Sequence, residues 1–380
     1  MPRYCIRCIL PEDRPGVLLD AEGVCRGCRN AEAKRRIDWS ERSAAFDRVV
    51  EHARSRAASY DCVIPVSGGK DSFWQVASCL ERGLRPLCVT YAVPGRTELG
   101  TRNLCRLLEL GVDHLELRID PHVERLFVER AFRKTGIPGL VSHMAIYRWP
   151  LRVAVTHDIP LVVYGENSAF EYGSEDDRLV GEAVDARWLE RFGVTAGTTA
   201  QDWADDDLPL RRLAAFLPVD EAVLAERGTR AVFLGYYLPW DPQGSLRVAL
   251  HHGFQPRAEG ARVGHYDYVN IDDDMIGVHH HPKWHKFGIT RTWDTLSMEI
   301  RNGRMTREEA IAHLRARGDE TPWDDIAVFC DYLGISQRDY FSVVEGFRNA
   351  SLWTRRDRRW VIDGFLVPDF PWPADPEPRA

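Results

Sequence analysis

Hydrophobic positions in the first half of the chain alternate between short apolar runs and helical spacing. The apolar run at 60–66 predicts a buried strand, and the apolar residues between 73 and 80 recur at i, i+3, i+4 and i+7, as in an amphipathic helix that ends near Gly83. Alternation of this kind predicts an α/β fold with a parallel, doubly wound sheet, whose ligands bind at the carboxyl ends of the strands. Strands are predicted at 60–66, 86–91, 112–119 and 161–165.

The remaining pattern divides the chain into three parts. We expect a small ribbon at 1–42, an α/β domain at 43–245 with an acidic insertion at 171–230, and a C-terminal region at 246–380. The insertion contains one expected helix, at 188–192. In the C-terminal region, Thr306 and Glu309 form a capping box, and further helices are expected from Thr321 and from Ser336, which together predict a small helical module.

Composition and charge narrow the possible functions of these 380 residues. Hydrophobic residues make up 44% of the chain, which is enough for a substantial core. Lys and Arg number 50 against 57 Asp and Glu, and this acidic balance disfavours a surface that grips nucleic acid. The start has no signal-peptide pattern, and the apolar runs are too short to span a bilayer, so we expect a cytoplasmic protein with no membrane partner.

Four of the nine cysteines lie within the first 28 residues. They form two C-x-x-C pairs, Cys5 with Cys8 and Cys25 with Cys28, separated by sixteen residues. This spacing is typical of a closed tetrahedral zinc site, which has a structural and not a catalytic role. Two disulfides or an iron–sulfur centre are the alternatives. We interpret this zinc ribbon as an appendage to the domain that follows.

A glycine loop links the first predicted strand to the helix after it. Its sequence is Ser67-Gly68-Gly69-Lys70-Asp71-Ser72. Strand, loop and helix in this order point backbone N–H groups and the positive end of the helix dipole at one spot, to which Lys70 adds a cation. A short glycine loop can occur in any strand-to-helix connection, but the flanking strand and helix favour a phosphate site. Asp71 would suit Mg²⁺, because a hard cation prefers carboxylate oxygen.

The loop lacks the Walker A spacing and instead resembles the PP-loop of ATP pyrophosphatases. That resemblance implies that ATP is bound with its β- and γ-phosphates held as leaving pyrophosphate, while a substrate oxygen attacks the α-phosphate. An adenylate is the implied product. The whole loop from Ser67 to Ser72, with Lys70 and Asp71 within it, is therefore the predicted cofactor-binding element.

Residues just beyond other predicted strands extend this candidate site. Thr90 and Tyr91 end the second strand and are expected near the nucleotide, while Gly165, Glu166 and Asn167 follow the fourth strand and are expected at the reaction centre. For Glu166 the plain alternative is a solvated loop carboxylate.

The C-terminal region carries basic and histidine residues close together. His279, His280 and His281 are consecutive, and because adjacent side chains diverge, we do not expect them to bind one metal ion. Lys283, Lys286 and Arg291 are better suited to a phosphate or diphosphate group.

Taken together, the motifs resemble those of the bacterial N-acetyl sugar amidotransferases, which make acetamidino sugars for surface polysaccharides and act in legionaminic and pseudaminic acid pathways. The resemblance implies ATP-dependent conversion of a sugar acetamido group to an acetamidine. It also implies an N-acetyl sugar or nucleotide sugar as substrate, and ammonia from partners similar to glutaminase and cyclase subunits. The segments that carry it are the four cysteines, Val66–Ser72, Gly165–Asn167, Leu234–Tyr237, Lys286–Gly288 and Glu299–Arg307.

On this basis we assign candidate roles to the motif residues. The predicted catalytic residues are Lys70, Asp71, Glu166, Lys286 and Arg291, and the predicted substrate contacts are Asn167, Tyr236 and Lys283.

Two other functions fit part of the pattern. A PP-loop sulfurtransferase could act on tRNA or a small metabolite, although the acidic charge argues against tRNA and isolated cysteines are usually small core residues. A non-catalytic scaffold with a dead nucleotide loop is disfavoured by the intact Lys70 and Asp71. The cysteines available to the sulfur hypothesis are Cys62, Cys79, Cys88, Cys105 and Cys330.

Overall fold

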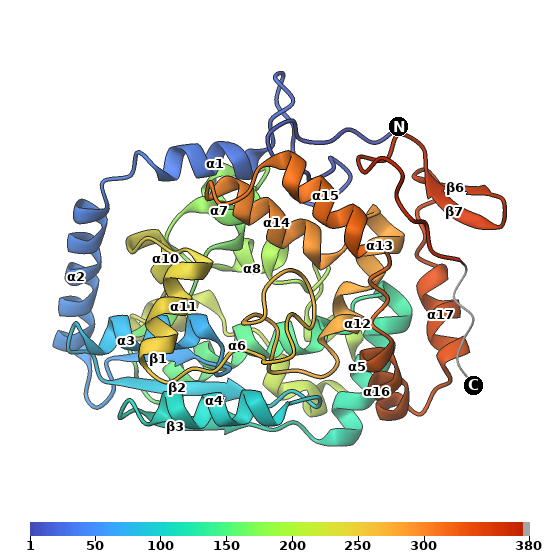
Figure 1. The fold of residues 1–380 in the computed structure, drawn as a ribbon. Coiled ribbons are helices and arrows are strands. Elements are labelled where there is room, and N and C mark those ends of the chain that lie inside the picture. The colour runs from blue at the N-terminus through green and yellow to red at the C-terminus, as the bar shows by residue number, and fades with distance from the viewer. Residues whose placement is uncertain (375–380) are drawn as a thin grey trace.

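A five-stranded parallel sheet forms the centre of the computed structural model, which describes residues 1–374 (Figure 1). The strand order is β3-β2-β1-β4-β5, and every pairing in it is parallel. This confirms the predicted α/β class with a doubly wound sheet. The strands are β1 (Cys62–Pro65), β2 (Pro86–Tyr91), β3 (Asp113–Leu117), β4 (Leu161–Tyr164) and β5 (Arg230–Phe233).

One strand was missing from the sequence prediction. Arg230 pairs with Leu161 and begins β5, although the predicted insertion extended to residue 230. Only four residues long, β5 is exposed at its start and follows an acidic stretch, so it lacks the long apolar run that marked the other strands. The edge strand β3 is mostly exposed on the outer side of the sheet.

Both faces of the sheet are covered by helices, as the alternation of side chains requires. Cys62 and Ile64 pack on one face with Phe46 of α2 and Phe73 of α3, whereas Val63 packs on the other face. The helices on the first face are α2 (Trp39–Arg56), α3 (Lys70–Leu80), α4 (Glu98–Leu108), α10 (Leu234–Tyr237) and α11 (Pro242–His251). On the other side lie α5 (Pro121–Thr135) and α6 (Leu140–Thr156), which the sequence pattern had not predicted.

The acidic insertion is folded into short elements that pack on the second face. Its predicted helix is present as α8, in which Trp188 is buried. Arg130 of α5 pairs with Asp205 and Asp207, which ties the acidic run to the domain. The elements are α7 (Ser168–Tyr172), η1 (Asp177–Val180), α8 (Ala186–Phe192), η2 (Ala200–Trp203), η3 (Leu210–Phe216) and α9 (Glu221–Arg227).

The C-terminal helices contribute to two different cores. Phe329 of α16 and Tyr340 of α17 stack around Phe132 of α5 and so extend the core of the α/β domain. The capping boxes at Thr306 and Ser336 are both formed. The elements of this region are α12 (Ile276–His280), α13 (Pro282–Phe287), α14 (Arg291–Arg301), α15 (Arg307–Arg317), α16 (Trp323–Leu333), α17 (Gln337–Glu345) and the hairpin β6 (Trp353–Arg356) with β7 (Arg359–Ile362).

The N-terminal cysteine ribbon packs against α14 and α15, so the first residues of the chain lie beside helices of its C-terminal region (Figure 1). Tyr4 stacks on Trp293, and the four cysteines share a core with Leu296 and Ala310. The ribbon continues into α1 (Arg26–Lys34). It is therefore an integral part of the fold, and its interpretation as an appendage is wrong. Across residues 1–374, no helix is both long and apolar enough to cross a bilayer.

Candidate functional site

The glycine loop lies between the carboxyl end of β1 and the start of α3. Gly68 has φ +88°, and a Cβ atom there would lie 2.7 Å from the backbone nitrogen of Leu104 in α4. The loop therefore needs glycine for its left-handed conformation and for its close contact with α4. The hydroxyl of Ser72 accepts a hydrogen bond from Ser67 N at 3.0 Å, and Ser67 Oγ accepts one from Gly69 N at 3.2 Å.

A cavity of about 360 Å³ opens beside this loop. It lies at the carboxyl ends of β1, β2 and β4, where ligands bind in doubly wound sheets. Five predicted site residues line it, namely Ser67, Ser72, Tyr91, Gly165 and Glu166. The cavity is also lined by residues of α6, of the segment before α12 and of the start of α12: Ser142, Ile146, Tyr147, Trp149, Asp272, Asp273 and Ile276.

Lys70 and Asp71 are paired with each other. The Lys70 ammonium lies 2.7 and 2.6 Å from the two oxygens of the Asp71 carboxylate, and the indole of Trp240 donates to Asp71 Oδ1 at 2.9 Å. Lys70 is only 3% exposed, and its Nζ also lies 5.4 Å from the centroid of the Trp240 indole. The two charged residues of the loop are thus held on the Trp240 side, next to the cavity.

Glu166 is a half-buried carboxylate in the wall of the cavity and not a solvated loop residue. Burial, followed by the nearby charge of Asp71, raises the pKa of Glu166 to about 7. A carboxylate with a pKa near neutrality can exchange protons at working pH. Gly235 packs closely behind it, because a Cβ at that position would lie 3.2 Å from the Glu166 Cα atom.

Two predicted ligand contacts have structural roles instead. The Thr90 hydroxyl donates to the Val66 carbonyl at 2.6 Å and is buried, so it holds β2 against the loop and does not reach the cavity. The Asn167 amide donates to the carbonyls of Leu179 and Gly181, and its oxygen accepts from Ala169 N and the Trp188 indole. All of its hydrogen-bonding capacity is used, which contradicts a role in binding substrate.

Tyr236 and Lys286 also lie away from the cavity. The Tyr236 ring stacks under the Arg42 guanidinium, 3.5 Å from centroid to Cζ, on the far side of Gly235. Lys286 donates to the Thr135 carbonyl at the end of α5, and its Nζ lies 4.8 Å from the Phe347 ring centroid. These contacts argue against the substrate role predicted for Tyr236 and the catalytic role predicted for Lys286.

Three charged residues of the cavity were not predicted from the sequence. Asp272 and Asp273 lie in its wall, and burial raises the pKa of both, that of Asp273 to about 7. Arg96 lies beside them, and its Nη1 is 3.5 Å from the Ser67 carbonyl. The acidic run Asp272–Asp274 can be seen in the sequence, but only the fold shows that it lies next to the loop. An isolated antiparallel backbone β-bridge between Arg96 and Asp273 holds the two segments together.

The cavity has carboxylates that suit a magnesium ion bound with ATP. Mg²⁺ carried by a nucleotide usually takes only one or two protein carboxylates, and Asp272 and Asp273 offer two within the cavity. Asp71, the predicted ligand, is engaged by Lys70 and Trp240. Within residues 1–374, the cysteine cluster is the single group of three or more metal-ligating side chains whose ligand atoms converge.

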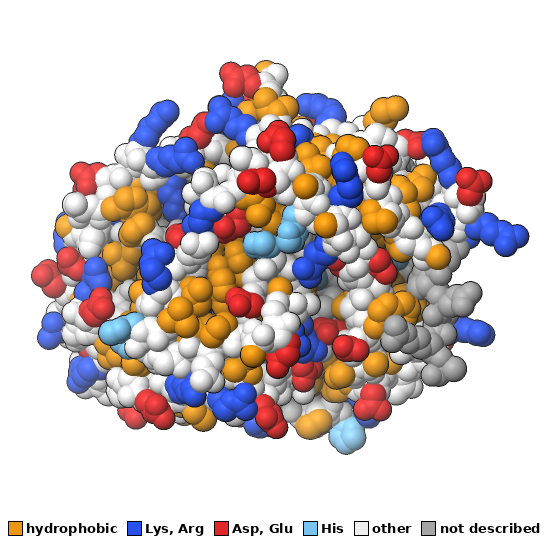
Figure 2. All heavy atoms as spheres, in the orientation of Figure 1, with side chains coloured by type: hydrophobic (Ala, Val, Ile, Leu, Met, Phe, Trp, Pro, Cys, Tyr) orange, Lys and Arg blue, Asp and Glu red, His pale blue; other side chains and the backbone are white. Residues whose placement is uncertain are grey.

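Lys283 and Arg291 come together around a buried carboxylate, Asp294. Lys283 Nζ lies 3.1 Å and Arg291 Nη1 3.5 Å from Asp294 Oδ2, and Arg14 from the ribbon lies 2.7 Å from Oδ1. Burial lowers the pKa of Lys283 to about 8. The rings of His143 and His279 stack nearby with centroids 5.1 Å apart. On the face drawn in Figure 2, histidine side chains lie near its middle, among basic and acidic ones.

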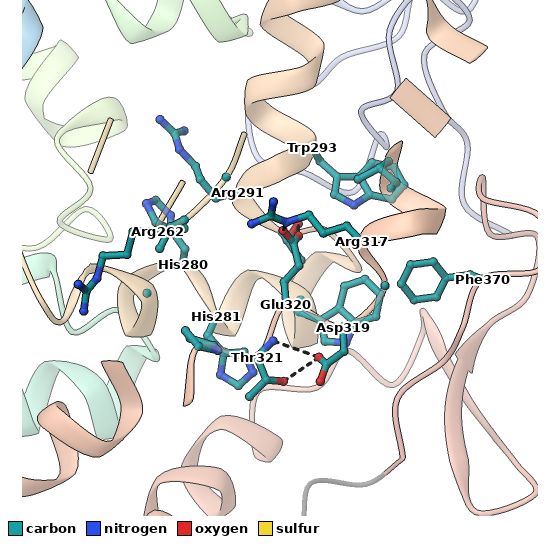
Figure 3. A pocket seen from close by; sticks show the side chains of 18 residues that line it. Arg262, His280, His281, Arg291, Trp293, Arg317, Asp319, Glu320, Thr321 and Phe370 are labelled. Atoms are coloured by element: carbon teal, nitrogen blue, oxygen red, sulfur yellow. Dashed lines mark hydrogen bonds and ion pairs between the residues drawn. The ribbon is translucent and has the colours of Figure 1, made fainter. Parts of the chain in front are cut away.

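A second cavity, of about 300 Å³, lies between α12, α14 and α15 (Figure 3). Figure 3 shows the Arg291 guanidinium and the His280 ring on one side of it, and Trp293 and Phe370 on the other. Glu320 accepts the hydroxyls of Thr290 and Thr292 and pairs with Arg317. His281 is hydrogen-bonded to the Tyr340 hydroxyl at 2.9 Å. Among residues 1–374, the three consecutive histidines do not belong to a group of three or more metal-ligating side chains whose ligand atoms converge.

The four N-terminal cysteines form a compact buried cluster. Their sulfur atoms all lie within 4.8 Å of one another, with Cys5 and Cys28 at 3.9 Å and Cys8 and Cys25 at 3.7 Å. A tetrahedral site with Zn–S bonds of about 2.3 Å requires S···S distances of about 3.8 Å, so the donor set fits zinc. The backbone nitrogens of Cys8 and Cys25 donate to Cys5 Sγ, as in metal knuckles.

Two arginines of the Glu299–Arg307 segment contact this cysteine cluster. Arg301 Nη2 lies 3.5 Å from Cys25 Sγ and 3.8 Å from Cys8 Sγ, and Arg307 Nε donates to the Cys8 carbonyl at 2.9 Å. Four thiolates around a divalent cation carry a net negative charge, which the guanidinium of Arg301 offsets. The segment Glu299–Arg307 therefore contacts the ribbon directly, and Glu299 itself holds Arg304 and Tyr266.

The strand order, the glycine loop and its helix define an α/β domain of the PP-loop type. Residues 261–364 match the family model described as "LPS biosynthesis protein WbpG-like, C-terminal domain". This match supports the similarity to proteins of surface polysaccharide synthesis, and it includes the Lys286–Gly288 and Glu299–Arg307 segments. No curated protein sequence matches the chain.

Two solved structures are similar to the chain at a low level. NMN synthetase from Francisella tularensis is 10% identical, over 78% of this chain and 94% of its own, with a TM-score of 0.35. NAD+ synthetase from Burkholderia pseudomallei is 16% identical, over 59% of this chain and 94% of its own, with a TM-score of 0.25.

Proposed function

We propose that this protein is an ATP-dependent amidotransferase that converts the acetamido group of an N-acetyl sugar to an acetamidine, releasing AMP and pyrophosphate. One observation carries the proposal. Asp272, Asp273 and Ile276 of the WbpG-like region line the same cavity as Ser67 of the PP-loop and Glu166. An adenylating loop and a region similar to a polysaccharide-synthesis protein thus contribute to one site.

The proposed reaction has two steps, adenylation of the amide oxygen and displacement of AMP by ammonia. The amide oxygen attacks the α-phosphorus of ATP, the bond from that phosphorus to the bridging oxygen breaks, and pyrophosphate leaves. The amide N–H proton is lost, giving an O-adenylyl imidate. Ammonia then adds to the imidate carbon, the C–O bond to AMP breaks, and an acetamidine remains. Each leaving group is far better than the oxide or hydroxide that direct amidation would require.

The residues of the cavity suit these steps. Backbone N–H groups of the loop at the start of α3, with Lys70 and Arg96, would stabilise charge on the departing pyrophosphate. Glu166, whose pKa is raised to about 7, is suited to take the amide proton. Asp272 and Asp273, with Asp71 if Lys70 turns to the phosphates, are the carboxylates that would hold Mg²⁺, which supplies charge neutralisation on the triphosphate.

The proposal also covers the source of the ammonia and the role of the cysteine cluster. We propose that separate proteins, similar to glutaminase and cyclase subunits, deliver the ammonia, and that the cysteine cluster binds one structural Zn²⁺. The sulfurtransferase alternative receives no support from the cavity, because no cysteine is among the described residues that line it. Cys62, Cys79 and Cys88 are buried in the sheet core.

The test is a mass-spectrometric assay with ATP, Mg²⁺, ammonium and a panel of N-acetylated nucleotide sugars and free sugars. We expect AMP together with an amidine-bearing sugar, lighter than its acceptor by about one mass unit because NH replaces O. The Lys70→Met variant should lower AMP formation by about 100-fold or more, while Lys134→Met, a change at an exposed lysine of α5, should not. AMP formation only with a sulfur donor, or with no sugar at all, would refute the proposal.

A further inference from the structure

Three cationic side chains surround a single carboxylate where the ribbon meets α13 and α14. Asp294 is 0% exposed, and its oxygens lie 2.7 Å from Arg14 Nε, 3.1 Å from Lys283 Nζ and 3.5 Å from Arg291 Nη1. In the described chain no other carboxylate pairs with these three cations. These three cations and one carboxylate carry a net charge of +2, and all four side chains are mostly buried.

Neighbouring groups add hydrogen-bond donors, while the acidic residues of the second cavity have partners of their own: Glu320 pairs with Arg317, and Asp319 accepts hydrogen bonds from Thr321. Burial lowers the pKa of His279 and of His280 well below the usual value, so both rings are neutral. Asn270 Nδ2 lies 3.3 Å from His280 Nε2 and donates to it, which leaves the proton on Nδ1. Among residues 1–374, His280 Nδ1 and Arg291 Nε are buried and have no hydrogen-bond partner. Buried donors of this kind are almost always satisfied, so they call for an acceptor from outside the chain.

The cluster lies next to the nucleotide cavity. His143 and His279 line a small cavity with Ser142 and Ile276, and the last two also line the cavity of the PP-loop. Arg291 and His280 line the second cavity shown in Figure 3, where they lie on the same side. The hydroxyl of Tyr172, in the short helix that follows the Glu166 loop, is 3.5 Å from Arg291 Nη1.

We propose that Arg14, Lys283, Arg291 and His280 form a binding site for a phosphate or diphosphate group of the acceptor. A net charge of +2 with two guanidinium groups matches a phosphate oxyanion better than a neutral hydroxyl or a single carboxylate. This inference rests on the proposed function for its ligand. It has two consequences: an uncharged N-acetyl sugar is a poor acceptor, and Arg14 makes the cysteine ribbon part of the acceptor site.

The test measures binding by calorimetry, with the full chain loaded with zinc and with neither ATP nor ammonia present. The probes are UDP–N-acetylglucosamine, UDP, N-acetylglucosamine 1-phosphate and N-acetylglucosamine. We expect binding of the three phosphate-bearing probes and none of the neutral sugar. Preference among the three distinguishes a diphosphate from a monophosphate. Because no adenylation is required, the result is independent of whether amidine is ever formed.

Variants locate the site. Arg14→Gln should weaken binding of the phosphate probes by at least about tenfold, which is the usual effect of losing one charged hydrogen bond. Arg7→Gln is the matched control, since Arg7 is an exposed ribbon arginine that pairs with Glu32. Zinc content and Tm of each variant show whether it is folded, and Lys283→Met provides a second loss of charge outside the ribbon. Unchanged binding in both Arg14→Gln and Lys283→Met, or binding displaced fully by ATP, would overturn the inference.

Discussion

The indole N–H of Trp240 donates a hydrogen bond to Asp71 Oδ1 across 2.9 Å, although the two residues are 169 positions apart. The same indole has Lys70 Nζ 5.4 Å and Lys34 Nζ 5.5 Å from its ring centroid. Lys34 in turn pairs with Glu171 and donates to the Trp240 carbonyl at 2.7 Å. Trp240 therefore links the charged residues of the PP-loop to the helix that follows the cysteine ribbon.

Trp240→Phe keeps an aromatic ring but removes the donor to Asp71. A hydrogen bond to a charged group contributes about 1.5–3 kcal/mol, so we expect the rate of AMP formation to fall by about tenfold or more, with little change in Tm. The assay is the ATP- and acceptor-dependent release of AMP. Trp360→Phe in the C-terminal hairpin is the control. Equal rates for Trp240→Phe and the wild type would show that Asp71 does not depend on this bond.

Gly68→Ala should be much more harmful than Gly111→Ala, although both glycines have φ near +90°. At Gly111 a Cβ would meet no atom within 4 Å, so the cost is the left-handed conformation alone, about 1–2 kcal/mol. At Gly68 the Cβ would also collide with the backbone of α4. Chemical denaturation measures both stabilities, and we expect the Gly68 variant alone to lose ATP binding. Similar behaviour of the two variants would argue against the close contact.

Cys25→Ser should abolish metal binding and destabilise the C-terminal half of the molecule as well as the ribbon. The cysteines share a core with α14 and α15, so loss of the metal disturbs the packing of both helices. We expect bound zinc to fall from about one per chain to near zero, and Tm to fall by about 5–10 °C. Elemental analysis and thermal melts make the measurement. Cys105→Ser, at an exposed position of α4, should change neither.

Binding of a phosphate-bearing acceptor should weaken as the pH rises through about 8. Burial lowers the pKa of Lys283 to about 8, so its ammonium is charged below this pH and neutral above it. The other charged groups that face it are Asp294, Arg291 and Arg14, and the adjacent histidines, whose pKa values burial lowers, are neutral already.

The measurement for this prediction is the Kd of UDP–N-acetylglucosamine between about pH 7 and 8.7, because its diphosphate does not titrate there and its uracil ring loses a proton only at higher pH. In Lys283→Met, binding should be weaker at pH 7.5 and nearly independent of pH. The same lowered pKa has the opposite effect on stability: the unfolded chain binds more protons than the folded one between about pH 8 and 10.5, so this lysine makes folding more favourable as pH rises. A pH dependence that persists in the variant would assign it to another group.

Elements of the fold that are specified by residues close together in the sequence could be predicted. The run from β1 through the loop to α3 is specified by consecutive apolar and glycine positions, and the capping box at Thr306 by a side chain three residues from its partner. The strand β5 was not, since its position depends on pairing with β4 across more than sixty residues. Helix α5 has its buried apolar residues at helical spacing between Asp120 and Gly136, so the pattern was present in the sequence and was overlooked; α6 contains Pro150 and is buried on a broad face, which blurs the helical period that marks a surface helix.

The residues of the candidate site were also predictable only where a local motif contains them. The loop, Glu166 and the cysteine pairs were identified because each lies within a short motif. Thr90 and Asn167 occupy the expected strand ends, yet their side chains point to backbone partners, which spacing alone does not reveal. Asp272, Asp273 and Arg96 were missed because they come to the cavity from segments far apart in sequence. Arg14 needed the contact between the ribbon and α14.

The packing of the ribbon on α14 and α15 has a consequence for how the chain is made. Its four cysteines leave the ribosome before Arg301 and Arg307, which contact the cluster and lie almost three hundred residues further along the chain. During synthesis the ribbon is therefore without the surface that covers it. Its thiols are exposed to oxidation and to competing metal ions until α14 and α15 have been made, so we expect zinc in this cluster to be enclosed only after Arg307 has left the ribosome.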